Sequence, residues 1–83
     1  ERAVTLASLD PGKSGRVRQV TAQGALRQSL LDKGMLPDAR ITVERVAPGG
    51  ARVFIRIGGY PITLTRREAL VVSLDPIPTD PVG

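Results

Sequence analysis

Residues 25–37 of this 83-residue chain read ALRQSLLDKGMLP, and they are the only stretch with a helical pattern. One apolar stripe forms at the helical step of about 100° per residue, from Leu26, Leu30 and Leu31. Gly34 stands where a helix ends, because the residue after the last turn often needs a positive φ angle. Pro37 cannot continue a helix. We therefore predict one short helix that docks tightly on a sheet through its leucines.

The segments around this helix alternate in the manner of strands. The predicted strands are residues 15–20, 40–47, 51–57, 60–65 and 70–74. Gly58-Gly59 has the spacing of a tight hairpin, and Thr65 with Glu68 has the capping-box spacing that starts a helical turn. The predicted core is Val17, Leu26, Leu30, Ile41, Val43, Val53, Ile55, Ile57, Ile62, Leu64, Leu70 and Val72. This pattern favours a mainly β fold, a small, strongly bent five-stranded barrel with one inserted α-helix.

The length allows one domain, which we place at residues 1–74. Residues 75–83 contain three of the seven prolines, and this composition is typical of a flexible C-terminal tail. No apolar run reaches the roughly 18 residues that a membrane-spanning helix needs. We expect a soluble, cytoplasmic protein.

Composition argues against catalysis and tight metal binding. The chain has no Cys and no His, so thiolate nucleophiles, imidazole bases and the usual ligands of zinc or iron are missing. Asp32 and Asp38 flank the helix end, but two carboxylates supply few of the oxygens that a hard cation needs. Gly12-Lys13-Ser14 lacks the first glycine of a phosphate-binding loop. We predict no enzyme activity, cofactor, metal site or small-molecule substrate.

Positive charge is concentrated in the body of the chain. The formal net charge is +4, yet residues 11–74 hold 11 basic and four acidic residues. Ten of the 12 basic residues are Arg, which grips carboxylate or phosphate with two prongs. Two interpretations stay open: an anionic partner, or arginines that only solvate an outer sheet face. Phe54 and Tyr60 are the only aromatic residues, so nucleic-acid binding by base stacking is disfavoured. Binding to a membrane surface is weaker still, because the helix uses its apolar face in the core.

Several ordered motifs resemble the FeoA family over about residues 4–74. They are Leu9-x-Pro11-Gly12-x-x-Gly15, Leu26-Arg27-Gln28-x-Leu30-Leu31-Asp32-x-Gly34-Met35-Leu36-Pro37, Val46-Ala47-Pro48-x-Gly50, Val53-x-Ile55-x-Ile57-x-Gly59-Tyr60 and Leu64-x-x-Arg67-x-Ala69. The resemblance implies a Src-homology-3-like barrel that serves as a cytoplasmic accessory of the ferrous iron transporter FeoB. Asp38 replaces the glycine usual after that proline, and Asp tolerates left-handed φ better than most residues.

An adaptor of this kind needs a surface rather than a catalytic site. We expect the partner to bind a groove beside the helix, through Arg27, Leu31, Met35, Leu36, Arg66 and Arg67. The alternatives are a nucleic-acid-binding barrel and the appended domain of a metal-dependent transcriptional repressor. Because no helix-turn-helix segment precedes the domain here, we expect a free-standing accessory. Several questions stay open: recruitment to the inner membrane through the partner, weak self-association and transition-metal binding in vivo. It is also open whether the protein activates, restrains or stabilises the transporter.

Overall fold

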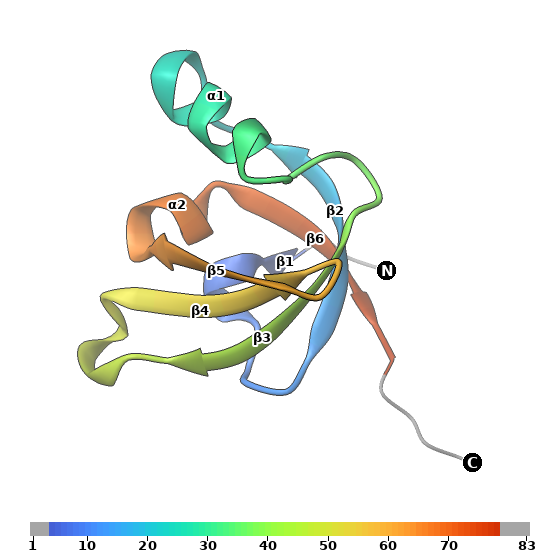
Figure 1. The fold of residues 1–83 in the computed structure, drawn as a ribbon, viewed down its shortest axis with the longest axis vertical. Coiled ribbons are helices and arrows are strands. Elements are labelled where there is room, and N and C mark those ends of the chain that lie inside the picture. Colours follow the sequence, from blue (N-terminus) through green and yellow to red (C-terminus); the bar gives the residue numbers. More distant parts are fainter. Residues whose placement is uncertain (1–3, 79–83) are drawn as a thin grey trace.

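The computed structural model describes residues 4–78 and contains one six-stranded antiparallel sheet (Figure 1). The strands are β1 (Val4–Thr5), β2 (Ser14–Val20), β3 (Arg40–Val46), β4 (Arg52–Ile57), β5 (Tyr60–Thr65) and β6 (Val72–Ile77). The helices are α1 (Gly24–Asp32) and α2 (Arg66–Leu70), with 3-10 turns η1 (Leu6–Ser8) and η2 (Pro48–Gly50). The mainly β prediction and the helix between the first two long strands are confirmed.

The predicted five-stranded barrel is wrong in strand number and in closure. The strand order is β1-β6-β2-β3-β4-β5, so the sheet is bent but open, with β1 and β5 at its edges. The missed strand is β1, where Val4 lies opposite Leu74 and Thr5 opposite Ser73. Two residues are too few to show an alternating pattern, so only their pairing partner reveals them.

Two irregularities bend the long strands. The register shifts between Val17 and Gln19 in β2 and between Val43 and Arg45 in β3, so Arg18 and Glu44 are extra residues in their strands. A bulge increases local twist, and both bulges therefore help the sheet to curve around its core.

The helical turn predicted after β5 is present as α2. The Thr65 hydroxyl accepts a hydrogen bond from the Glu68 N–H at 3.2 Å, and the Glu68 carboxylate accepts one from the Thr65 N–H at 2.8 Å. The helix runs through Leu70, so the last strand starts at Val72 rather than at residue 70. Leu70 is 48% exposed and is not the core residue we predicted, because the helix turns it away from the face that Ala69 buries.

The final strand extends past the predicted domain boundary at residue 74. Asp75, Pro76 and Ile77 continue β6 and lie opposite Arg16, Gly15 and Ser14 of β2. Three residues assigned to a flexible tail are therefore part of the sheet. The end of that predicted tail, residues 79–83, lies outside the described residues.

The core is one cluster between the sheet, α2 and the turn after α1. Its fully buried large side chains are Leu6, Leu30, Met35, Ile41, Val43, Ile55, Leu64, Val72 and Leu74. Eight of the twelve predicted core residues are buried: Val17, Leu30, Ile41, Val43, Val53, Ile55, Leu64 and Val72. Leu26, Ile57 and Ile62 are only partly buried against the cluster.

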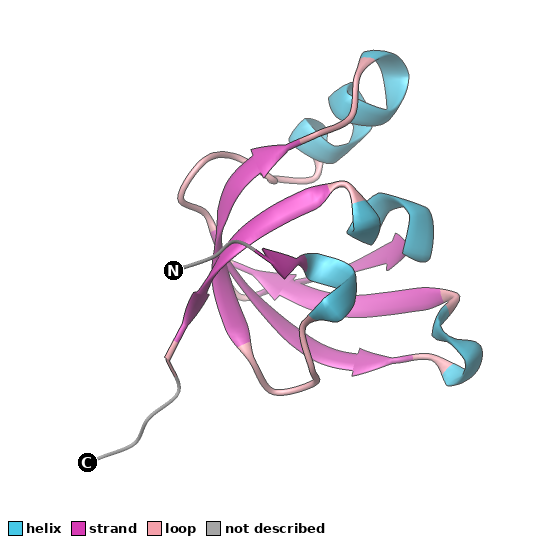
Figure 2. Cartoon of the chain, turned by 180° about the vertical axis from the view of Figure 1, so that it is seen from behind, coloured by secondary structure: helices cyan, strands magenta, loops and turns pink. Residues whose placement is uncertain are grey.

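Helix α1 is less tightly docked than the leucine stripe predicts. Figures 1 and 2 show it projecting from one end of the sheet, with its C-terminal end nearest the strands. Of its three leucines only Leu30 is fully buried. Gly34 ends the segment at φ 105°, as predicted, and leads into the buried Met35. The helix is thus anchored at one end and leaves most of its surface to solvent.

Candidate functional site

A groove runs between the second half of β2 and the inner side of α1. Its volume is about 190 Å³, and it is lined by Val17, Arg18, Gln19, Val20, Arg27, Leu31, Met35 and Pro37. Its apolar lining comes from β2, from α1 and from the turn after the helix, while Arg18 and Arg27 contribute two cations. An apolar hollow with arginines around it is the usual composition of a protein-binding surface.

Arg27 and Leu31, two of the six predicted residues, both line this groove. They stand one helical turn apart, so they lie on the same side of α1. The Arg27 guanidinium donates a hydrogen bond to the Val20 carbonyl at 3.2 Å, which ties the helix to the end of β2. Leu31 is half-buried and keeps part of its side chain accessible from the groove.

Met35 is not the accessible residue we predicted. It is fully buried, and its N–H donates to the Leu30 carbonyl at 3.1 Å as the chain turns back under the helix. The next residue, Leu36, is 53% exposed but lies outside the groove lining. Met35 therefore supports the groove from beneath, and Leu36 offers apolar surface beside it.

The two predicted arginines of α2 do not line the groove. The Arg66 N–H donates to the Ala51 carbonyl at 3.0 Å. Its guanidinium reaches Gly50, where an added Cβ atom would stand 3.0 Å from Nη1. Arg66 is thus turned toward the β3–β4 connection, and Arg67 follows it on the same exposed helix. The six predicted residues therefore do not form one surface. The sequence could not show this, because it does not determine the direction in which α2 points.

A partly buried ion pair joins the end of α1 to α2. Lys33 Nζ lies 2.8 Å from Glu68 Oε2, and the side chains are 33% and 13% exposed. Burial works to raise the pKa of Glu68, but the hydrogen bonds from Lys33 and from the Thr65 backbone outweigh it and hold the pKa below its usual value. Glu68 therefore caps α2 and fixes the C-terminal end of α1 with one carboxylate.

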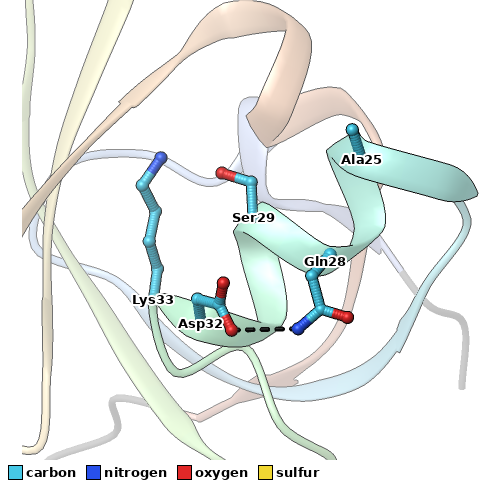
Figure 3. A pocket seen from close by; sticks show the side chains of 5 residues that line it. All are labelled: Ala25, Gln28, Ser29, Asp32 and Lys33. Carbon is cyan, nitrogen blue, oxygen red and sulfur yellow. Dashed lines mark hydrogen bonds between the residues drawn. The ribbon is translucent and has the colours of Figure 1, made fainter.

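A second, more open hollow of about 420 Å³ lies on α1, lined by Ala25, Gln28, Ser29, Asp32 and Lys33 (Figure 3). Asp32 accepts a hydrogen bond from Gln28 Nε2 at 2.9 Å, one turn earlier in the helix. Within residues 4–78, no group of three or more His, Cys, Asp or Glu side chains is placed to hold a metal ion. Nothing in this hollow adds chemistry beyond polar contact.

Sequence patterns missed the strand side of the groove. Val17 is predicted as a core residue and Val20 only as the last residue of the same strand, and nothing in their spacing shows that they line a groove with α1. Pro37 was assigned only as a breaker. The signal that could have been used is the bulge at Arg18, because bulges turn side chains away from the regular face.

In the described part of the chain, no helix is long and apolar enough to cross a membrane.

Comparison with known proteins gives a consistent result. The family model of the FeoA domain matches residues 4–75. A crystal structure of an iron uptake regulatory protein, FeoA, is 28% identical with a TM-score of 0.83, over 92% of this chain and 100% of that one. FeoA of Stenotrophomonas maltophilia in complex with zinc is 25% identical with a TM-score of 0.77, over 87% and 89% of the two chains. That protein is described as a procaryotic SH3 domain protein with a suggested role as a ferrous iron transport activating factor.

The same fold occurs within larger regulators. A manganese-dependent transcriptional repressor is 17% identical with a TM-score of 0.85, and the match covers 93% of this chain but 42% of the repressor. This likeness shows the fold alone. No curated protein sequence matches the chain significantly.

Proposed function

The chain belongs to the FeoA family, and from this membership we propose that it is a cytoplasmic accessory of ferrous iron uptake that docks to a FeoB-like membrane transporter. The match over residues 4–75 carries this proposal, together with the iron-transport roles named for its relatives. The chain acts here as an adaptor rather than as an enzyme. Its partner would be the cytoplasmic part of the transporter.

The docking surface in this proposal is the groove between β2 and α1. Arg27 and Leu31 line it, and the exposed Leu36 extends its apolar area. Interfaces favour arginine and large apolar side chains, so this combination suits a protein partner. Met35 is left out because it is buried, and Arg66 and Arg67 are left out because they do not line the groove. α1 projects from the sheet, which leaves the helix accessible to a partner (Figure 2).

Replacing Arg27 by Glu and Leu36 by Asp tests the surface. We expect the double variant to lose co-purification with the transporter and to lower iron uptake, because it puts two carboxylates where the proposal needs a cation and apolar area. Co-purification from membranes and uptake of radioactive ferrous iron are the measurements. The affinity loss at an interface centre is about 2 kcal/mol or more, roughly thirtyfold.

The matched control is Arg67→Glu, which reverses an exposed charge on α2 outside the groove. All variants must first melt like the wild type. If the folded double variant keeps wild-type co-purification and uptake, the groove is not the docking surface. If a folded wild-type chain neither co-purifies with the transporter nor affects uptake, the transporter-accessory function itself is rejected.

A further inference from the structure

Four exposed arginines lie on the outer face of β3 and β4, and none of them lines the groove beside α1. We call Arg40, Arg45, Arg52 and Arg56 the arginine face. Along β4, Val53 and Ile55 point into the core, so Arg52 and Arg56 alternate to the outside with Phe54 between them. Along β3, Arg40 precedes the buried Ile41, and Arg45 lies opposite Phe54 after the bulge. The face is therefore set by strand register.

Little negative charge balances this face. The side chains of Arg40 and Arg52 make no ion pair or hydrogen bond with any residue of the described range 4–78. The one acid on it is Glu44, which pairs with Arg56. Arg40 lies directly opposite Arg16 on β2, and like charges in that position destabilise a sheet. Asp75 lies opposite Arg16 on the other neighbouring strand, β6, but forms its ion pair with Arg18. Arg40 therefore carries an unpaired positive charge opposite a second positive charge, and this arrangement does not stabilise the sheet. Binding of an anionic partner explains the arrangement better.

The residues around Arg40 form a shallow seat for an anion. A hollow of about 350 Å³ is lined by Arg40, Thr42, Arg56, Gly58 and Gly59. Arg56 is held in place by Glu44 and by a 2.7 Å hydrogen bond from its guanidinium to the Gly59 carbonyl. Arg40 has its whole guanidinium available beside this fixed group. A carboxylate can bind such a guanidinium through two parallel hydrogen bonds.

The composition of the face favours protein carboxylates over nucleic acids and lipids as its anionic partner. Arg45 lies 3.9 Å above the centre of the Phe54 ring and covers the one aromatic ring on this side. On this face, no uncovered ring is left to stack a nucleic-acid base. The exposed large apolar residues within 4–78 are Leu36, Val46, Tyr60 and Leu70, and none belongs to this face, so it has nothing to insert into a lipid layer. Carboxylates on a protein need neither feature.

We propose that the arginine face is a second docking surface, which binds an acidic segment of a protein partner. This proposal does not rest on the proposed function, because no residue of the arginine face lines the groove beside α1. The chemistry of the arginine face requires aspartate or glutamate side chains arranged along the strands.

The test measures fluorescence anisotropy of a labelled oligoglutamate peptide with the full chain, at low and at physiological ionic strength. The face variant carries Arg40→Glu and Arg52→Glu. The control carries Arg66→Glu and Arg67→Glu on α2, which line neither the arginine face nor the groove and take the formal net charge from +4 to 0 just as the face variant does. We expect the peptide to bind the wild type and to bind the face variant about tenfold more weakly than the control.

Parallel titrations use an oligothymidylate and anionic lipid vesicles. Equal losses in the two variants would show that net charge alone drives binding and would overturn the proposal. So would absence of peptide binding, or tighter binding of the oligonucleotide or the vesicles than of the peptide. If the face variant fails to melt like the wild type, Arg40→Gln with Arg52→Gln replaces it. Its control is then Arg66→Gln with Arg67→Gln, and the same tenfold criterion applies.

Discussion

Glu68 shows how one side chain serves several elements. Its carboxylate accepts from the Thr65 N–H and pairs with Lys33, so it closes the capping box of α2 and holds the end of α1. These hydrogen bonds favour the charged form and keep its pKa below the ordinary value of 4.5. A carboxyl group with a lowered pKa in the folded state stabilises the protein above its unfolded pKa. That contribution is lost as the pH falls through the folded value.

We predict that Glu68→Gln lowers the free energy of unfolding at pH 7 by about 1 kcal/mol. Gln still accepts a hydrogen bond from the Thr65 N–H, so the change removes the charge while keeping the cap. The difference in unfolding free energy between variant and wild type should shrink toward zero as the pH falls from about 5 to about 3. This is roughly the range in which a carboxyl group takes up its proton. Urea unfolding at several pH values measures it. A difference that stays constant with pH would assign the effect to packing instead.

At the scale of elements, α1 places one fully buried side chain in the core. Leu30 is fully buried within the core cluster, whereas Leu26 on the same stripe is only partly buried. Isolated helices of this length are marginal in water, so tertiary contact must hold α1. The rest of its surface is free for the groove and for the open hollow.

We predict that Leu30→Ala lowers the free energy of unfolding by about 2–5 kcal/mol, because it leaves a cavity in the core. Leu26→Ala is the matched control and should cost about 1 kcal/mol, since less of its surface is buried. Chemical denaturation followed by circular dichroism compares them. Similar small losses for both variants would mean that α1 contributes little to the cooperative unit.

For the whole molecule, the sheet is completed by residues beyond the expected boundary. Asp75, Pro76 and Ile77 extend β6 along β2, and Gly15 permits this contact. A Cβ atom on Gly15 would stand 3.2 Å from the Asp75 carbonyl oxygen. Ile77 is half-buried opposite the buried Ser14, and Asp75 pairs with Arg18.

We predict that ending the chain after Leu74 lowers the free energy of unfolding by about 1–3 kcal/mol, because three paired residues and their buried surface are lost. A chain that ends after Pro78 keeps every described residue and serves as the control. Thermal melting of the three chains measures the effect. Equal melting of the chain ending at Leu74 and the control would restore the shorter boundary.

Local signals in the sequence determined much of this protein. The positive φ angles of Gly34, Gly58 and Gly59 follow from helix-end and hairpin rules, and the capping box of α2 follows from Thr65 and Glu68. Asp38 adopts φ 70°, the left-handed value expected of a residue in the place of a glycine. Alternation placed the long strands, and the ordered motifs identified the FeoA family. All of these depend on residues within a few positions of one another.

Pairing and direction in space were decided only by the tertiary structure. Val4 and Thr5 are a strand because β6 lies beside them, and Met35 is buried because the chain turns back under α1. Arg66 does not line the predicted groove, because α2 directs its guanidinium toward Gly50. The arginine face exists because β3 and β4 bring Arg40, Arg45, Arg52 and Arg56 to one side. Each of these outcomes depends on contact between segments distant in the sequence, and local propensity carries no information about which segments meet.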